Sequence, residues 1–248
     1  MYNLDLLKCL DALLSSSSYH DYCPNGLQIA GKERIKKVIC GVSLTRELID
    51  IAIAKHADAI IVHHGAFWNK TPYNITGIQY NRIAPIIKND INLFAYHLPL
   101  DNHPQLGNNF QLAKLLQLSN IRQDSGNNLL WFGELAHDFT LQQFAAHYQS
   151  ITQHKPVYFA RDDKLIRRIG LCTGGAVSLF DEAIKHNIDM YITGEIKENV
   201  MGQSLESDVG YLAGGHYVTE RYGIMALAEY LRSELNLDAE FIELYNPI

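Results

Sequence analysis

The feature that most constrains the fold of this chain is a strand-helix-strand pattern that occurs twice. In the first copy, a strand-like run at 38–43 is followed by a helical segment, Asp58 and a second strand. The same order returns at 169–174, where a helix, Asp189 and a strand follow. Strands separated by helices pair in parallel. We therefore predict an α/β fold with two pseudo-equivalent βαβ lobes, mainly parallel or mixed sheets, and helices packed on them.

Hydrophobic periodicity places the individual elements and the domain boundaries. Helical patterns cover 4–14, 45–55, 83–89 and 140–149, with a short helical face after Asn108, and strand patterns cover 37–42, 59–63, 91–96, 131–135 and 157–159. The polar, glycine-containing stretch 119–128 is the predicted boundary. We expect a first lobe at 1–125, an added strand-helix-strand segment at 126–165, and a second lobe at 166–248.

Composition excludes several classes of protein. The chain has 248 residues, of which 47% are hydrophobic and 19% are charged, which is typical of a globular protein. The net charge of -6 offers no basic surface for bulk nucleic-acid binding. The first residues lack the basic and apolar regions of a secretory signal, and the four cysteines show no C-x-x-C spacing. We expect a cytoplasmic protein with reduced cysteines and no membrane contact.

A strand predicted to be buried ends in two adjacent histidines. The apolar run 59–62 leads directly into His63, His64 and Gly65. In open α/β sheets, ligands bind at the carboxyl ends of strands, and neutral imidazole is a common ligand of transition metals. Adjacent residues of a regular strand point to opposite faces, so neighbouring histidines serve two metal ions more readily than one.

A histidine and a carboxylate four residues apart follow a strand in each copy. The pairs are His97 with Asp101, and His216 with Glu220. From the residues alone we predict a dinuclear metal site with these ligands: His63, His64, Asp101, His216 and Glu220. Glu220 is the predicted bridge between the two ions, because a carboxylate has two oxygens and an imidazole cannot bridge in this way.

The two pairs are expected to differ in geometry. His216 and Glu220 share a face if a helix begins at His216. Pro99 disfavours a continuous helix through Asp101, which leaves His97 either a metal ligand or a hydrogen-bond partner of ligands. In the expected pairing, His63 shares an ion with His216, and His64 shares the other with Asp101.

Two further features leave alternatives open. Glu195, which the alignment of the two copies places opposite His64, is either a general base or a charge at the start of a helix. Together with His97 it is a candidate proton shuttle. Gly174 and Gly175 follow a strand and either cradle a phosphate or form a tight turn.

At these residues the chain resembles the GTP cyclohydrolase I type 2 homolog family, also described as the Nif-three-like family. The resemblance covers essentially the whole length and is carried by the motifs at 21–28, 61–65, 96–101, 106–109, 172–175, 192–195 and 215–221. It implies dinuclear metal ligands at His63, His64, Asp101, His216 and Glu220, and it places His97 close to the metals. It also implies a toroidal homohexamer whose sites face an internal cavity.

The resemblance implies a function as well. The family name implies hydrolytic opening of the imidazole ring of GTP, so we expect a metal-dependent hydrolase acting on a nucleotide or a related small molecule. A metal-dependent phosphoesterase is an alternative that uses the same apparatus. A second alternative, from another class, is a metal-containing oligomeric scaffold or interaction protein without turnover. Histidine and carboxylate ligands permit Zn, Fe, Mn, Co or Ni at two sites per chain.

Overall fold

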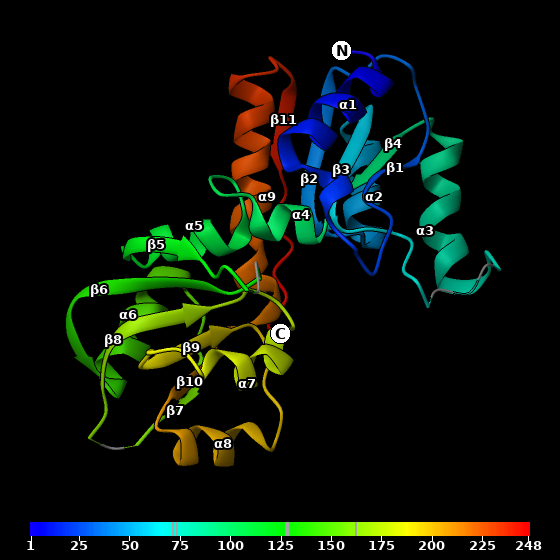
Figure 1. Ribbon diagram of the computed structural model, residues 1–248. Helices are drawn as coiled ribbons and strands as arrows, with labels where there is room; N and C mark the ends of the chain where they lie inside the picture. Colours follow the sequence, from blue (N-terminus) through cyan, green and yellow to red (C-terminus); the bar gives the residue numbers. More distant parts are fainter. Residues whose placement is uncertain (71, 73, 127–128, 162) are drawn as a thin grey trace. The chain divides into compact units, whose positions relative to one another are not determined.

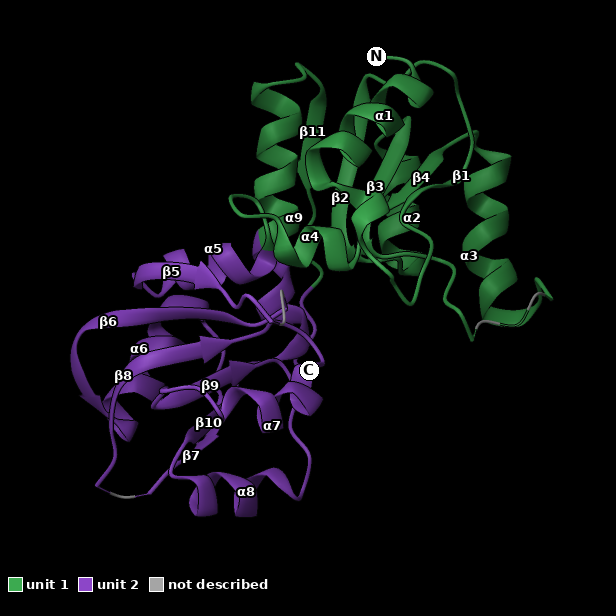
Figure 2. Ribbon diagram, in the orientation of Figure 1, with its two compact units in different colours: residues 1–107, 223–244 green, residues 108–222, 245–248 purple. Residues whose placement is uncertain are grey.

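The computed structural model describes residues 1–70, 72, 74–126, 129–161 and 163–248. The chain forms two compact units, drawn in green and purple in Figure 2. Unit 1 comprises residues 1–107 and 223–244, and unit 2 comprises residues 108–222 and 245–248. Each unit has one sheet with helices packed on it (Figure 1). The predicted α/β class with two similar lobes is confirmed.

Unit 1 is built on a five-stranded sheet in the order β1-β4-β3-β2-β11. β2, β3, β4 and β11 run parallel, and β1 pairs antiparallel with β4. The elements of this unit are α1 (Asn3–Leu14), the short 3-10 helix η1 (Ser16–Ser18), β1 (Gly26–Ile29), β2 (Lys37–Ser43), α2 (Arg46–Ala54), β3 (Ala59–His64), α3 (Gly77–Lys88), β4 (Asn92–Ala95), α4 (Leu98–Asn102) and β11 (Asp238–Phe241).

The core of unit 1 explains why β3 reads as a continuous apolar run. Residues 59–63 are all buried, because the strand is central and the sheet is covered. Ile60 and Val62 pack in one cluster with Leu48 of α2 and with Ile83 and Ile86 of α3. Alternate residues of a strand point to opposite faces, so this cluster occupies one face of the sheet.

Unit 2 is built on a six-stranded sheet in the order β5-β6-β8-β9-β10-β7. β8, β9 and β10 run parallel, and the other pairings are antiparallel. Its elements are α5 (Asn108–Leu115), β5 (Ser119–Gln123), β6 (Trp131–Thr140), α6 (Leu141–Thr152), β7 (Val157–Phe159), β8 (Leu165–Leu171), the 3-10 helix η2 (Ala176–Leu179), α7 (Phe180–Ala183), β9 (Met190–Thr193), α8 (Val200–Ser207), β10 (Gly210–Ala213) and α9 (His216–Ser233). α9 is one helix, and its residues 223–233 are counted in unit 1.

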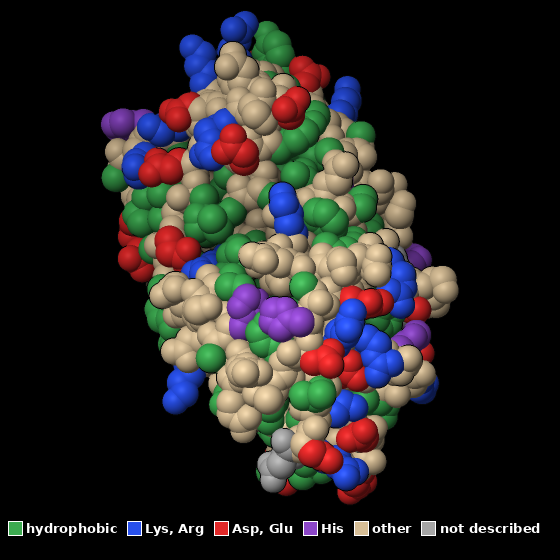
Figure 3. All heavy atoms as spheres, turned by 90° about the vertical axis from the view of Figure 1, so that its left-hand side faces the viewer, with side chains coloured by type: hydrophobic (Ala, Val, Ile, Leu, Met, Phe, Trp, Pro, Cys, Tyr) green, Lys and Arg blue, Asp and Glu red, His purple; other side chains and the backbone are tan. Residues whose placement is uncertain are grey.

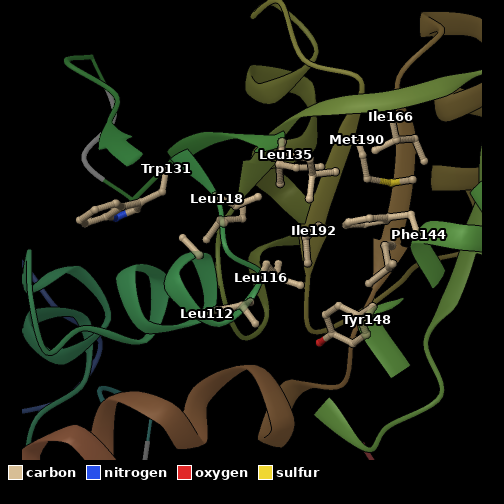
Figure 4. Packing of buried hydrophobic residues seen from close by; sticks show 14 of the residues in the cluster. Leu112, Leu116, Leu118, Trp131, Leu135, Phe144, Tyr148, Ile166, Met190 and Ile192 are labelled. Atoms are coloured by element: carbon tan, nitrogen blue, oxygen red, sulfur yellow. The ribbon is translucent and has the colours of Figure 1, made fainter. Parts of the chain in front are cut away.

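Two apolar clusters cover the two faces of the second sheet. Met190 and Ile192 of β9 pack with Phe144 and Tyr148 of α6, as the close view in Figure 4 shows. Tyr191, between them in sequence, packs in a different cluster that includes residues of η2, α7 and α8. The period of two along β9 thus places helices on both faces of the parallel strands.

The repeat read from the sequence is confirmed in atomic detail. Asp58 Oδ2 accepts a hydrogen bond from the backbone N–H of Lys37 at 3.1 Å, and Asp189 Oδ2 accepts one from that of Arg168 at 2.8 Å. The amide of the residue before each of these also donates to the same aspartate. Each aspartate therefore ties the start of the second strand of its copy (β3 or β9) to the first strand (β2 or β8).

The predicted domain boundaries differ from the structure for reasons of strand pairing. The first unit ends at 107 rather than 125, because β5 pairs with β6 of the second sheet. The expected linker 119–128 therefore begins with a strand, and its residues 127–128 lie outside the described part of the chain. The segment 126–165 is no separate addition, since β6 and β7 both belong to the second sheet. The C-terminal segment returns to unit 1 through the pairing of β11 with β2.

Candidate metal centre

β3 delivers His63 and His64 to the carboxyl end of the first sheet, as predicted. His63 is fully buried, and its Nδ1 lies 2.9 Å from the carbonyl oxygen of Tyr96. A carbonyl oxygen only accepts hydrogen bonds, so Nδ1 carries the proton and the neutral ring has its lone pair on Nε2. Nε2 lies 3.5 Å from Oδ1 of Asp101. The backbone of Tyr96, directly after β4, thus orients His63 as a ligand through Nε2.

The two adjacent histidines converge in spite of the strand geometry. Their ring centroids are 4.6 Å apart, and one ring nitrogen from each of His63, His64 and His97 lies within 4.8 Å of the others. β3 ends at His64, so strict alternation of faces no longer applies there. His64 is positioned by Ser43 of the neighbouring strand, whose Oγ lies 2.9 Å from His64 Nδ1.

Gly65 is required where the chain leaves β3. A Cβ atom at this position would lie 2.4 Å from Oε1 of Gln28 and 2.6 Å from Cβ of Ala95. No side chain fits, and Gln28 Oε1 instead accepts a hydrogen bond from the backbone N–H of Ala66 at 2.8 Å. Gln28 therefore fixes the loop that follows the histidine pair.

His97 is held by Asp21, a residue that the spacing argument did not identify. His97 Nδ1 lies 2.7 Å from Asp21 Oδ1, and the His97 backbone N–H donates to Asn25 Oδ1 at 2.8 Å. Burial alone would raise the pKa of Asp21, but the hydrogen bonds and charge of His97, with the donors of Asn25 and Leu98, outweigh it and lower the pKa to about 2. A carboxylate with this pKa is ionised at neutral pH, so it fixes the His97 proton on Nδ1.

Cys23 lies beside this pair but stays a neutral thiol. Ligand atoms of Asp21, Cys23 and His97 lie within 4.8 Å of one another. Burial, together with the negative charges of Asp21 and Asp101, raises the pKa of the Cys23 thiol to about 12. All four cysteines are free, in agreement with the prediction of reduced thiols.

Asp101 lies in a helix, contrary to the expectation from Pro99. α4 begins at Leu98, and the N–H groups of Leu100 and Asp101 both donate to the His97 carbonyl. Pro99 stands in the first turn, where its missing N–H removes no helical hydrogen bond. The structure also places Asp101 beside His63, which favours a pairing of these two residues over the expected pairing of Asp101 with His64.

Unit 2 presents a second histidine and carboxylate from the first turn of α9. The helix begins at His216, and its Nε2 lies 3.0 Å from Oε2 of Glu220, which is 2% exposed. On the other side of the ring, Nδ1 lies 2.7 Å from Oε1 of Glu195. Burial lowers the pKa of His216, but the two carboxylates outweigh it and raise the pKa to about 9. The expectation that His216 and Glu220 share a helix face is confirmed.

The geometry also bears on the roles left open for Glu195 and for the glycine pair. Glu195 follows β9 outside any helix, and its contact with His216 Nδ1 is that of a positioning carboxylate. Gly174 has a positive φ of 69°, and a Cβ there would lie 1.9 Å from Oε1 of Glu220. Its N–H donates to Oγ1 of Thr219 at 3.0 Å. The turn therefore makes room for the Glu220 carboxylate.

The donors in each unit fit a transition metal. Bonds of about 2.1 Å from one ion to two ligand atoms at angles of 90–110° separate those atoms by about 3.0–3.4 Å. The separations of 3.5 Å for His63 with Asp101 and 3.0 Å for His216 with Glu220 are close to this range. The atoms involved are imidazole nitrogen and carboxylate oxygen, which suit Zn, Fe, Mn, Co or Ni.

The residues that hydrogen-bond to the histidines and to the loop after β3 could hardly be predicted from sequence patterns. Asp21, Asn25 and Gln28 lie in the loop before β1 and in β1 itself, far along the chain from the histidines that they contact. No periodicity marks them, and only the resemblance to a family motif at 21–28 pointed to this segment. Ser43 ends β2, and only the pairing of β2 with β3 brings it beside His64.

On the face drawn in Figure 3, basic and acidic side chains are intermingled and form no single broad basic patch. Among the described residues, no helix is both long and apolar enough to cross a membrane.

Comparison with known proteins gives the family. The model of the Duf34/NIF3 (NGG1p interacting factor 3) family matches residues 1–247. The chain belongs to this family. A GTP cyclohydrolase 1 type 2 homolog from Haemophilus influenzae is 43% identical over 250 residues, with both chains covered completely.

Solved structures similar to this chain have the same fold. Protein ybgI, described as of unknown function, has a TM-score of 0.96 and 39% identity, with 100% of both chains covered. TTHA1606 from Thermus thermophilus has a TM-score of 0.89 and 30% identity, again with 100% of both chains covered. The resemblance read from the sequence motifs is therefore confirmed.

Proposed function

We propose that this chain is a dinuclear metal-dependent hydrolase that acts on a nucleotide or a related small molecule. One observation carries the metal-binding part of the proposal. His63 and His216, two of the proposed ligands, each direct Nδ1 at an oxygen that only accepts hydrogen bonds, a backbone carbonyl or a carboxylate. This arrangement presents Nε2 as the ligand nitrogen and is characteristic of histidines that bind metals. The names of the relatives support the nucleotide part.

The proposed ligands of two divalent ions per chain come from both units. They are His63, His64 and Asp101 in unit 1, and His216 and Glu220 in unit 2. Ions of this kind supply Lewis-acid character and lower the pKa of water toward neutrality.

The residues around the ligands have separate tasks in this proposal. Asp21 keeps the His97 proton on Nδ1, so His97 Nε2 is the atom that accepts and returns a proton during hydrolysis. Glu195 performs the same orienting task for His216 and thereby keeps His216 Nε2 available as a ligand. Ser43 orients His64 through its hydroxyl. A hydrogen-bonded set of this kind holds the donors and acceptors in one geometry while the substrate reacts.

Elemental analysis combined with a nucleotide panel tests the proposal. Purified protein should hold about two ions per chain and hydrolyse at least one nucleotide. His64→Ala and Glu220→Ala should lose turnover while circular dichroism shows a retained fold. His137→Ala removes an exposed histidine of β6 and is the matched control, with metal content and turnover unchanged.

Two results would contradict the proposal. The first is full turnover in a metal-free double variant that lacks His64 and Glu220. The second is a metal-loaded protein that turns over no nucleotide and loses its oligomeric state on chelation, which is the behaviour of a metal-dependent scaffold.

We also propose that the chain assembles as a homohexamer. The support is the family resemblance and not a feature of either unit. Light scattering coupled to size-exclusion chromatography checks it, since a hexamer has six times the mass of the 28.1 kDa chain. A monomer or dimer at working concentration would contradict the assembly without affecting the metal ligands.

A further inference from the structure

Unit 1 contains a cavity that the metal ligands do not use. Its volume is about 510 Å³, which lies in the usual range for sites that bind small molecules. One wall is formed by described residues of the segment between β3 and α3, and the other by the first turns of α3. The residues that line it include Gly65, Ala66, Trp68, Ile78, Gln79 and Arg82.

Helical periodicity explains why α3 presents these side chains to the cavity. Ile83 and Ile86 of α3 are buried in the core of unit 1. Ile78 and Arg82 are four residues apart, so they share another face of the helix. Ile78 is 72% exposed, although it is a large apolar residue. The core therefore does not account for the residues that α3 directs at the cavity.

Trp68 lines the cavity and also lies close to the rings of His64 and His97. Its ring lies 5.1 Å from that of His97 and 5.8 Å from that of His64, measured between ring centroids. The same indole lines the cavity. Trp68 therefore borders the cavity and also lies next to the two imidazole rings. Stacking of aromatic rings on indole favours flat, electron-rich or heteroaromatic groups.

Arg82 supplies the complementary charge. Among the residues that the structure describes, its guanidinium has neither an ion-pair nor a hydrogen-bond partner, although it lines the cavity. Arginine binds phosphate and carboxylate groups through paired N–H donors, and the interaction strengthens where water is partly excluded. A ligand of this cavity is therefore expected to carry an anionic group as well as a flat ring.

We propose that this cavity is the binding site for a heteroaromatic anion of the purine-nucleotide class. In this proposal the ring lies against Trp68, and the phosphate lies on Arg82. The proposal rests on the proposed function for the identity of the reaction, but ligand binding here requires neither bound metal nor turnover.

The tryptophan content of the chain allows a direct test. The chain has two tryptophans, Trp68 and Trp131. Trp131 is 3% exposed in the core of unit 2, so Trp131→Phe leaves Trp68 as the only indole reporter. Fluorescence of this variant, freed of metal by chelation, is titrated with guanosine and with guanosine monophosphate. Both should quench saturably, and the phosphate should tighten binding about tenfold, as a charged hydrogen bond does.

Arginine variants distinguish phosphate binding in the cavity from general electrostatic attraction of the ligand to the protein. Arg82→Gln should abolish the advantage of the monophosphate and leave guanosine binding unchanged. Arg34→Gln removes the same charge from an exposed arginine of unit 1 that does not line the cavity, and it should change neither affinity. The proposal is overturned if neither ligand quenches Trp68 saturably, or if both arginine variants weaken monophosphate binding equally.

Quenching of Trp68 and turnover of nucleotides test the binding site and the proposed function independently. Saturable quenching without turnover under any metal condition would remove the hydrolase and keep the binding site. Turnover of nucleotides with no quenching of Trp68 would keep the hydrolase and remove this site.

Discussion

Replacing Asp21 by asparagine should weaken unit 1 by about 2 kcal/mol at neutral pH. The side chain is 2% exposed and accepts hydrogen bonds from His97 Nδ1 and from the backbone N–H of Leu98. Its pKa falls from the ordinary value of 3.8 to about 2. This difference corresponds to about 2 kcal/mol of preferential stabilisation of the folded state by the ionised carboxylate.

The sign of the pH dependence follows from the lowered pKa. The stabilisation by Asp21 is fully present above the unfolded pKa of 3.8 and is lost as the pH falls from 3.8 toward about 2. Asp21→Asn has no such titration. The difference in unfolding free energy between wild type and variant should therefore be largest at neutral pH and shrink below about pH 4.

Urea denaturation across this pH range measures the effect. Asp50→Asn is the matched control, because Asp50 forms an exposed i,i+4 ion pair with Arg46 in the same unit. Such pairs contribute about 0.3–0.5 kcal/mol. If Asp21→Asn and Asp50→Asn destabilise the protein equally at neutral pH, the account of Asp21 as a buried anchor of His97 is wrong.

The remaining predictions concern unit 2. Gly174→Ala places a Cβ atom 1.9 Å from Glu220 Oε1 and should therefore reduce the zinc content measured by elemental analysis. In the control variant Gly202→Ala, the added Cβ atom has no neighbour within 4 Å, so the zinc content should be preserved. Normal zinc content in Gly174→Ala would refute the close-approach argument. Protons compete with zinc for His216, whose pKa is about 9, so the zinc affinity of the metal-free protein should rise with pH, about tenfold per unit, up to about pH 9. Calorimetry at several pH values checks this, and Glu195→Gln should lower the pH at which the affinity levels off. An affinity that does not change between about pH 6 and about pH 8 would contradict it.

The sequence predicted those parts of the fold that depend on local periodicity. β2, β3 and β7 lie where the apolar runs placed them, and α1 and α2 follow their helical patterns closely. β11 was not predicted, because its pairing with β2 joins segments about two hundred residues apart and leaves no local pattern. β5 was missed for a related reason. It is mostly exposed, so it lacks the alternation that marks a half-buried strand.

In the candidate site, too, the residues marked by a local sequence pattern were predicted, and those that depend on distant contacts were not. His63, His64, His216 and Glu220 were identified because they follow strand ends or occupy one helical turn, and both signals are local. Asp21 escaped the spacing argument, since its contact with His97 spans 76 residues and depends on how a loop packs. The placement of Asp101 beside His63 likewise depends on where α4 begins, and Pro99 in its first turn was misread as a helix breaker.

Metal stoichiometry tests the central claim most directly. The protein is stripped by chelation, dialysed against excess zinc and then against zinc-free buffer, and analysed for metal per chain. We predict about two ions for wild type and a clear loss in His63→Ala and in Glu220→Ala, with His137→Ala unchanged. A wild-type protein that retains no zinc, or ligand variants that retain as much as wild type, would contradict the claim that these residues bind metal.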